Sequence, residues 1–422
     1  YGDIGTSPLY VFNSIIKDRV IDETLILGTL SLIIWTITML TTVKYVVMVL
    51  RADNRGEGGI FSLFALVRRR KKWLVIPAMI GGAALLSDGI ITPPISITSA
   101  IEGLKELPKF HDLNQDTIVY IVLGIIFLFF FTQQFGTSNI GKFFGPFMSV
   151  WFAMLAVLGL IHISDDFGIL KALNPYYGIR FLTVYPEGFW LLGAVFLCTT
   201  GAEALYSDLG HCGRGNIRIS WMFVKVCLLL NYFGQGASLL KHHSGQLLNK
   251  ATINAEGINA FYDLMPGWFI VPGVVIATSA AIIASQAMVS GSYTLINEAI
   301  RLNLWPKLKV VYPTEARGQI FIPAINTLLF AGCVGVVLYF RESAKMEAAY
   351  GLAIITTMIM TTILFANYMV LHRVNPGLIY LFLAAYITIE FSFLTALMDK
   401  FIHGGYITLM IGFMMFTVMY VW

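Results

Sequence analysis

Residues 1–10 read YGDIGTSPLY, and they place an acid, two glycines, two hydroxyls and a proline at the head of an otherwise apolar run. A carboxylate in hydrocarbon costs about 2.5–3.5 kcal/mol even on the mildest insertion scales, so Asp3 indicates a functional segment. The glycines loosen a helix, Ser7 suits the N-cap of a new one, and Pro8 fits its first position. The stretch therefore predicts a helix that is interrupted beside Asp3. In many membrane transporters, the backbone carbonyls at such an interruption are not used in helix hydrogen bonds and bind ions instead.

The rest of the chain has the composition of a membrane protein. Hydrophobic residues make up 57% of the 422 positions and charged residues 12%, with a mean hydropathy of +0.75, whereas soluble domains contain about 25% charged residues. Since about 20 helical residues cross a bilayer, ten apolar runs can span or nearly span it: Leu27–Leu50, Ile118–Phe131, Phe147–Ile161, Phe189–Cys198, Trp221–Tyr232, Trp268–Ile296, Ile320–Phe340, Met346–Leu371, Leu378–Leu397 and Ile407–Trp422. Adding Trp73–Lys105 and the opening segment predicts an all-α integral membrane protein with twelve spans.

Both ends of the printed sequence fall inside predicted spans. The opening segment is too short for a full span, so we expect an apolar half-helix upstream of it. The last apolar run continues to Trp422, the final residue.

Basic residues predict the orientation. When the spans alternate, the loops on one side hold 15 Lys and Arg against 4 acids, and those on the other side hold 11 against 13. The positive-inside rule makes the first side cytoplasmic, with both termini inside. The basic run at residues 68–72 fits this topology and contact with anionic membrane lipid, and we predict no nucleic-acid binding.

The sequence offers no residue set for catalysis or for a cofactor. The four cysteines are separated by 14, 15 and 106 positions, which fits neither a disulfide framework nor a metal site. We found no P-loop, no Rossmann glycine pattern and no Ser-His-Asp arrangement. We therefore predict a protein that is not an enzyme and that uses no cofactor.

Part of the opening motif is repeated later in the chain. Gly5–Tyr10 is followed 196 residues later by Gly201–Tyr206, with Gly, Leu and Tyr at matching positions. The second copy also lies mid-span and carries an acid, Glu203, and the topology gives the two spans opposite directions. Two interrupted helices of opposite direction indicate an inverted repeat with a binding site between the interruptions.

A polar stripe on the third span supports this prediction. Asp88, Thr92 and Ser96 fall within 80° on a helix, with Ser99 and Glu102 close to that stripe. Such a stripe must face protein or water, because lipid cannot satisfy it. At 1.5 Å per residue, Asp88 is expected near mid-depth and Glu102 at the external mouth.

Four acids, Asp3, Asp88, Glu102 and Glu203, are thus expected along one route, which predicts a cation pathway. The spans hold few bases, Lys44 and Lys225. The alternative is structural: each acid pairs with one of these lysines or with backbone amides.

These residues carry a resemblance. Gly2–Tyr10 resembles the signature of the KUP (Kup/HAK/KT) potassium-uptake family, and so do Asn54–Gly59, Asp88–Pro93, Ala100–Gly103 and Gly201–Tyr206. The resemblance implies a LeuT-like fold of the amino acid/polyamine/organocation type. Its parts would be a first repeat over 1–163, an inverted second repeat over 164–373, and two more helices over 374–422. Relatives also have a cytoplasmic C-terminal domain, which we expect to lie outside the printed sequence.

The resemblance also implies K⁺ uptake coupled to H⁺ entry. The family's ion-site residues correspond to Asp3, Tyr10, Asp88, Thr92, Ser96, Thr200 and Tyr350, and its functionally important glutamates to Glu102 and Glu203. Homodimers occur in some relatives, and a regulatory cyclic dinucleotide is a candidate partner because some bacterial K⁺ importers bind one.

The energetics favour an added proton. One charge gains about 2.3 kcal/mol per 100 mV, and moving H⁺ with K⁺ about doubles that driving force at equal pH. Glu203 is our first candidate for the proton-linked acid, and Asp3 is its competitor. Three alternatives remain open: an amino acid or polyamine transporter of the same fold, a K⁺ channel, although we found no TVGYG-like filter, and a membrane-embedded enzyme.

The topology can be tested directly. We expect the loop over residues 51–72 to be cytoplasmic and the loop over 105–116 to be external, because of the charge asymmetry. The measurement is labelling of single introduced cysteines by an impermeant reagent applied from outside. Labelling beside Arg69 would contradict the orientation.

Overall fold

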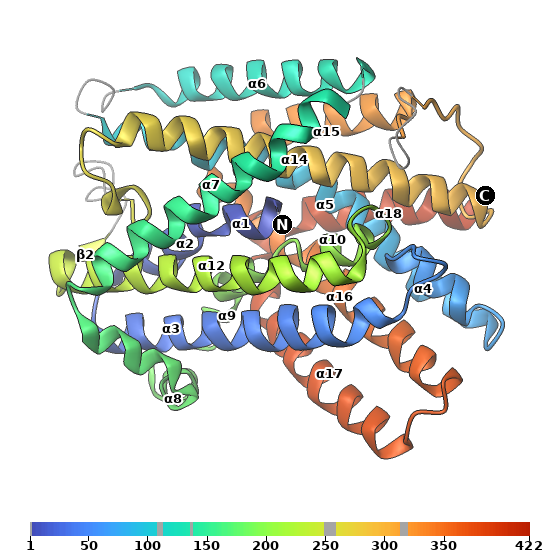
Figure 1. Cartoon of the computed structure of the whole chain (residues 1–422), viewed down its shortest axis with the longest axis horizontal. Helices are drawn as coiled ribbons and strands as arrows, with labels where there is room; N and C mark the ends of the chain where they lie inside the picture. Colours follow the sequence, from blue (N-terminus) through green and yellow to red (C-terminus); the bar gives the residue numbers. More distant parts are fainter. Residues whose placement is uncertain (1, 108–112, 136–137, 249–258, 313–319) are drawn as a thin grey trace.

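The computed structural model describes residues 2–107, 113–135, 138–248, 259–312 and 320–422. Within these ranges the chain is helical apart from its loops and one small antiparallel sheet, in which β1 (Arg19–Val20) pairs with β2 (Leu247–Leu248) (Figure 1). Ten helical segments of the described chain are long and apolar enough to cross a membrane. The prediction of an all-α integral membrane protein is confirmed at this level.

Several of the ten spans consist of an α-helix that continues into a 3₁₀ or π segment, and shorter helices lie in the connections between spans. The spans are α3 (Glu23–Thr36) with η2 (Ile37–Met48) and η3 (Val49–Arg51); η4 (Lys72–Leu74) with α5 (Val75–Glu102) and η5 (Gly103–Glu106); α6 (Gln115–Thr132) with η6 (Gln133–Phe135); α7 (Ser138–Ile163); α12 (Arg214–His243); α14 (Ile270–Arg301); α15 (Pro323–Phe340); α16 (Ser343–Leu371); and α17 (Pro376–Met398). The tenth is η10 (Phe401–Gly405) with α18 (Tyr406–Val421). The connections hold α4 (Ile60–Val67), η7 (Phe167–Leu173), α8 (Pro175–Val184), α11 (Leu209–Cys212) and η9 (Tyr262–Leu264).

The other two predicted spans are interrupted helices, so the count of twelve stays a prediction. The first consists of α1 (Gly2–Thr6), the 3₁₀ turn η1 (Ser7–Leu9) and α2 (Val11–Ile16). Tyr10 leaves helical geometry at φ −132° and ψ −20° and precedes α2. The interruption therefore exists, but our expectation that Ser7 caps the new helix is wrong. Ser7 and Pro8 lie in the 3₁₀ turn, and the Ser7 hydroxyl contacts Leu197 and Thr200 across the bundle.

The second interruption lies at the repeated motif Gly201–Tyr206, where the sequence predicted it. α9 (Leu192–Val195) continues into the 3₁₀ turn η8 (Phe196–Thr199), and α10 (Ala202–Ser207) begins after Gly201. Thr200 leaves the helix at ψ 141°, and Gly201 is left-handed at φ +84°. Since glycine adopts that conformation without a steric penalty, Gly201 allows the chain to turn there.

The two interruptions lie against each other near the middle of the molecule, where Figure 1 shows α1 and α10. A Cβ atom added to Gly201 would lie 2.9 Å from the Ile4 nitrogen and 3.1 Å from Asp3 Cβ. The Ser7 hydroxyl donates to the Leu197 carbonyl over 3.1 Å. Polar groups of one interruption thus provide hydrogen-bond partners for the backbone of the other. Backbone groups in a hydrocarbon environment need such partners inside the protein.

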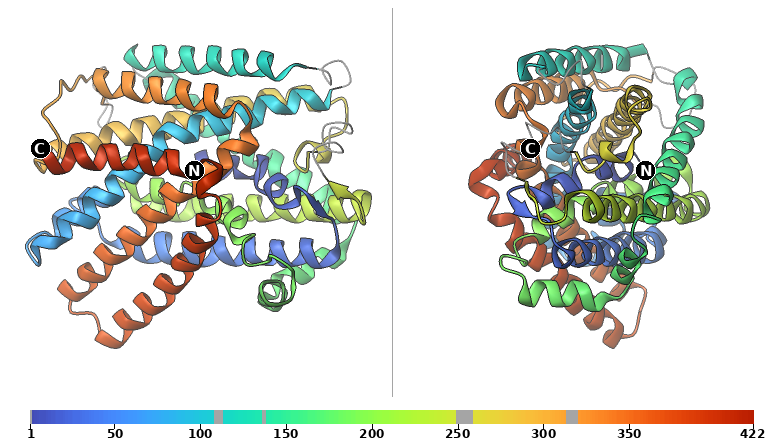
Figure 2. Two further views of the ribbon diagram at one scale, coloured as in Figure 1. Left: turned by 180° about the vertical axis from the view of Figure 1, so that it is seen from behind. Right: turned by 90° about the vertical axis from the view of Figure 1, so that its left-hand side faces the viewer.

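Two helices, α5 and α16, form the inner layer. In the most apolar stretch of each of these two helices, 83% of the residues are buried. The corresponding shares are 28% in the last span and 33% in α17. α5 contacts α14, α15, α16 and α18, and most of the long helices run roughly alongside one another (Figure 2). Two prolines, Pro93 and Pro94, lie in the interior of α5. They remove the amide donors for the carbonyls of Gly89 and Ile90, and the Cys333 thiol donates to the Ile90 carbonyl over 3.3 Å.

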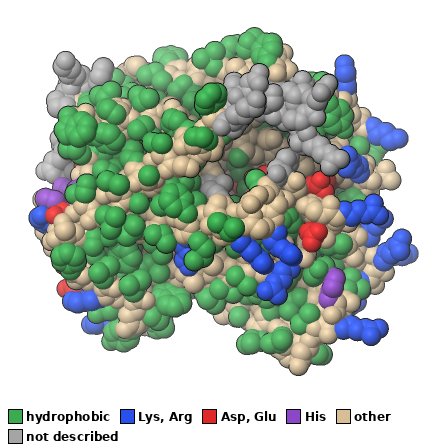
Figure 3. All heavy atoms as spheres, viewed as in Figure 1, with side chains coloured by type: hydrophobic (Ala, Val, Ile, Leu, Met, Phe, Trp, Pro, Cys, Tyr) green, Lys and Arg blue, Asp and Glu red, His purple; other side chains and the backbone are tan. Residues whose placement is uncertain are grey.

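Charge is distributed unevenly over the surface. Figure 3 shows most of the visible Lys and Arg side chains at one end of the bundle, the end at which α4 and the C-terminus lie, and apolar side chains across much of the rest. The basic run at residues 68–72 is mostly exposed there. This asymmetry agrees with the predicted loop charges, and the assignment of that end to the cytoplasm stays a prediction.

The contact between the two interruptions can be tested at Gly201. We expect Gly201→Ala to lower the thermal stability of the purified protein by more than about 1–2 kcal/mol, because an L-residue is strained at this φ and its Cβ would press on the Ile4 backbone. The matched control is Gly335→Ala, since Gly335 is exposed within α15 and has open space around it. Equal unfolding temperatures for the two variants would contradict the contact.

Candidate functional site

Asp3 lies in the single turn of α1 and is only 3% exposed. The Tyr350 hydroxyl of α16 donates to its Oδ2. Its other oxygen, Oδ1, is buried and has no hydrogen-bond partner among the described residues. A buried carboxylate oxygen without a hydrogen-bond partner costs free energy. A cation beside this atom, or a proton bound to it, would remove that cost.

Hydroxyl groups from both interruptions meet next to Asp3. Ser7 Oγ lies 3.0 Å from Thr200 Oγ1, and the Tyr10 hydroxyl lies 3.3 Å from each of these two atoms. The Ser7 hydroxyl is also 3.3 Å from the Asp3 carbonyl oxygen. The interruptions thus place two aliphatic hydroxyls and a phenol within one buried group.

The polar stripe of α5 reaches the same region. Thr92 donates to Asp88 Oδ1 over 3.1 Å, and Ser96 Oγ lies 3.5 Å from the hydroxyl of Thr6. Thr6 in turn donates to the Asp3 carbonyl over 3.0 Å. Ser96 is therefore linked to the Asp3 group, whereas no hydrogen bond between described residues joins the Asp88 and Thr92 pair to it.

All seven residues predicted to bind a cation are buried, each with an exposed fraction of 3% or less: Asp3, Tyr10, Asp88, Thr92, Ser96, Thr200 and Tyr350. We refer to them as the central site. They offer two carboxylates and five hydroxyls, and no Lys or Arg side chain of the described chain is bonded to them. Sequence reasoning missed two further hydroxyls, those of Thr6 and Ser7. Their positions three and four residues after Asp3 were the available signal.

Glu102 lies at the last residue of α5, and it is half-buried. Its carboxylate accepts from the Ser343 amide over 3.1 Å and from the Ser343 hydroxyl, at the start of α16. A carboxylate is favourable at a helix N-terminus, where amides lack internal partners. Glu102 therefore lies at the end of the stripe, as predicted, and also ties α5 to α16.

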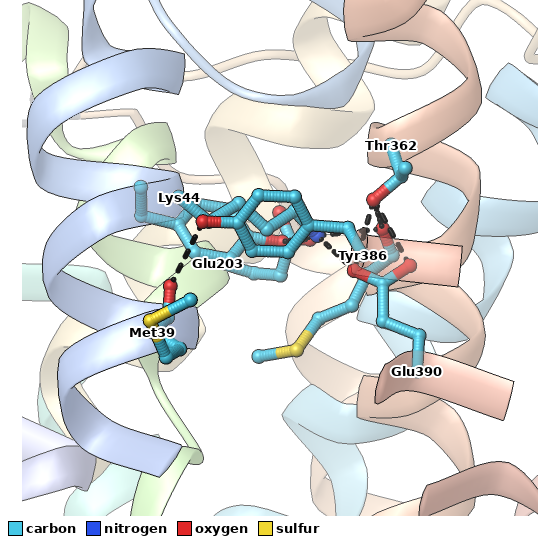
Figure 4. Close-up of polar contacts among 8 residues, drawn as sticks. Met39, Lys44, Glu203, Thr362, Tyr386 and Glu390 are labelled. Carbon is cyan, nitrogen blue, oxygen red and sulfur yellow. Dashed lines mark hydrogen bonds and ion pairs between the residues drawn. The ribbon is translucent and has the colours of Figure 1, made fainter. Parts of the chain in front are cut away.

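Glu203 belongs to a second buried group, which Figure 4 shows. It lies in the first turn of α10 and accepts from the Tyr45 hydroxyl of η2. Tyr45 accepts from the Lys44 ammonium over 3.2 Å, and Lys44 pairs with Glu390 of α17 over 2.6 Å. We expected the four acids along one route, and the structure gives Glu203 bonding partners separate from those of Asp3 and Asp88.

Glu390 was missed by sequence reasoning, although its signal was the same as that of Asp3. It is an acid within the apolar run Leu378–Leu397, and such a residue needs a partner. Lys44 was noted as one of two bases in the spans, but the sequence does not say which acid it meets.

Comparison with known proteins identifies the family. The sequence profile described as "K+ potassium transporter integral membrane domain" matches residues 1–422. The chain belongs to the K⁺ potassium transporter family.

Curated members of the K⁺ potassium transporter family include several bacterial proteins named "Probable potassium transport system protein Kup". The chain is 59% identical over 423 residues to the one from Flavobacterium psychrophilum and 59% over 432 residues to that from Cytophaga hutchinsonii. It is 53% identical over 431 residues to that from Clostridium perfringens. In each case all of this chain aligns, and it spans 63–65% of the length of the relative.

Proposed function

We propose that this chain is the membrane domain of a secondary K⁺ importer that moves K⁺ together with H⁺ by alternating access. One observation carries the K⁺ assignment. The buried Asp3 carboxylate has an oxygen without a described hydrogen-bond partner, and it lies beside hydroxyls that the two helix interruptions bring together. Membership of the K⁺ potassium transporter family supports this assignment.

The ligand chemistry favours an alkali cation. K⁺ channels replace the hydration shell of the ion with several weak oxygen dipoles, and the central site offers hydroxyls of that kind. Asp3 and Asp88 supply negative charge that offsets the cost of removing water from the ion. The hydroxyls of Ser7, Tyr10 and Thr200 lie 3.0–3.3 Å from one another, a spacing that favours a bare ion over an amino acid or a polyamine.

The proposed fold rests on the two interruptions. We propose that residues 1–163 and 164–373 form inverted repeats and that residues 374–422 add two helices, which gives twelve spans in a LeuT-like arrangement. The adjacency of α1 and α10 supports this, since transporters with inverted repeats bind ions between their interrupted helices. A site enclosed between such repeats also favours alternating access over a channel.

Proton coupling is proposed for Glu203. Its carboxylate is 3% exposed and is held by a phenol rather than by a cation, so a bound proton would leave it neutral in a buried setting. Asp3 is the competitor, because it too is buried with an unpaired oxygen. A homodimer and a cyclic dinucleotide stay predictions, as does the cytoplasmic placement of both termini.

The neutral ligands can be tested one at a time. We expect Thr92→Val or Ser96→Ala to raise the rubidium concentration for half-maximal uptake by about 2- to 10-fold, because each removes one hydroxyl of several, worth about 0.5–1.5 kcal/mol. Glu102→Gln should weaken capture from outside while leaving equilibrium ion binding at the central site unchanged. The measurement is rubidium flux into proteoliposomes.

Thr29→Val is the matched control for the hydroxyl variants. Thr29 is buried in α3 and bonds to the Leu25 carbonyl of its own helix. Unchanged kinetics in all three test variants would mean that the stripe on α5 is structural.

The charged residues have separable roles. We expect Asp3→Asn and Asp88→Asn to abolish thermal stabilisation by K⁺, because each keeps the shape of the side chain but removes the charge. Glu203→Gln should keep that stabilisation and lose rubidium accumulation driven by a pH gradient, since it mimics a permanently protonated acid. The measurements are unfolding temperatures with and without K⁺, and uptake after a pH jump.

Two outcomes would overturn these assignments. If Glu203→Gln still accumulates rubidium after a pH jump, Asp3 becomes the better candidate for the proton-linked acid. If both aspartate variants are still stabilised by K⁺, the cation site lies elsewhere.

A further inference from the structure

The group around Lys44 is an ion pair with an additional acid. Lys44 and Glu390 are both fully buried, and their charged atoms are 2.6 Å apart. The ammonium donates to three acceptors, the Glu390 carboxylate, the Met358 carbonyl at 2.9 Å and the Tyr45 hydroxyl at 3.2 Å. Its three donors are thus all used, and none is left for a direct bond to Glu203.

Tyr45 connects this ion pair to Glu203. Its hydroxyl accepts from Lys44 and donates to the Glu203 carboxylate. A hydroxyl that accepts from a cation becomes a stronger donor, because hydrogen bonds in a chain polarise one another. The charge of Lys44 therefore acts on Glu203 through one intervening group.

The charges of the group do not balance without a proton. Glu203 and Glu390 contribute two negative charges and Lys44 one positive charge, so the buried group carries one net negative charge when both acids are ionised. An uncompensated buried charge is strongly unfavourable. Binding one proton makes the group neutral.

Geometry decides which acid receives that proton. Glu390 has the ammonium in direct contact, and the Thr362 hydroxyl lies 2.9 Å from each of its oxygens. Glu203 has the Tyr45 hydroxyl as the donor that the structure records for it. The better-stabilised carboxylate stays ionised, so the proton belongs on Glu203.

Two other titratable groups near α10 bond to residues outside this group. Tyr206 of α10 donates to the Ala52 carbonyl over 2.6 Å, and Glu298 of α14 accepts from Ser62 of α4 over 2.8 Å. The groups that face Glu203 are Tyr45 and Lys44 of η2, Glu390 of α17 and the neutral hydroxyl of Thr361 of α16.

We propose that Lys44 and Glu390 are positioning residues that assign the coupled proton to Glu203. Glu390 holds the Lys44 ammonium in place, and Tyr45 transmits its effect. The inference rests on the proposed proton coupling and adds a role for α17, which lies outside the proposed repeats. α17 is fixed to η2 a second time, because the Tyr386 hydroxyl donates to the Met39 carbonyl over 3.2 Å (Figure 4).

The proposal predicts shifts of opposite sign. In Glu390→Gln the Lys44 charge is left to balance Glu203, so the pH midpoint of rubidium uptake in proteoliposomes should fall by about one unit or more. In Lys44→Met two acids remain without a base, so the midpoint should rise. The double variant Lys44→Met/Glu390→Gln restores the net charge, and its midpoint should return close to that of the unmodified chain.

Glu298→Gln is the control, since it neutralises a half-buried acid outside the group, and its midpoint should not move. The double variant leaves no unpaired member of the ion pair, so it keeps the test valid where Lys44→Met does not fold. As a second readout, the infrared band of a protonated carboxyl should disappear in Glu203→Gln and persist to higher pH in Lys44→Met.

The outcomes separate this inference from the proposed function. Midpoints that stay fixed, or that move in the same direction in both single variants, would show that the ion pair only braces the helices. Uptake by the unmodified chain that ignores a pH gradient would instead overturn proton coupling itself.

Discussion

The contact between two interrupted helices is the constraint on which the rest of the structure depends. Hydrocarbon offers no hydrogen bonds, so a helix that stops within the membrane must find partners for its polar groups inside the protein. The Ser7 hydroxyl meets this need by bonding to the Leu197 carbonyl and by lying beside Thr200. Gly201 makes the approach possible, because a side chain there would collide with the Ile4 backbone. The surrounding helices enclose this contact, and the buried acids lie on them or beside it.

The sequence was informative wherever a polar residue stood in an apolar run. Asp3, Asp88 and Glu203 were all recognised in this way, and both interruptions lie in the predicted segments. Pattern alone could not identify partners, because pairing depends on how helices pack across hundreds of residues. Thus the sequence could not show that Lys44 meets Glu390, 346 positions away. Local details also escaped: Ser7 suits an N-cap by residue type, but contacts across the bundle determine its actual role.

Charge is distributed between two buried groups with different compensation. The central site has two acids and, among the described residues, no bonded base, a composition that suits a mobile cation. The group around Lys44 contains its own fixed cation and is one proton short of neutrality. α10 takes part in the second group through Glu203, and Thr200, two residues before the start of α10, belongs to the central site. A movement of this short helix would change both groups together.

The two prolines in the interior of α5 have a mechanical consequence. A helix resists bending because bending stretches the bonds between its turns, and at Pro93 and Pro94 two of these bonds are missing. α5 is therefore most flexible one turn from Asp88, at the level of Thr92. α5 is helical on both sides of that level, so each half can tilt as a rigid segment about it. Tilting one half outward would widen one end of the bundle while the other end stays packed.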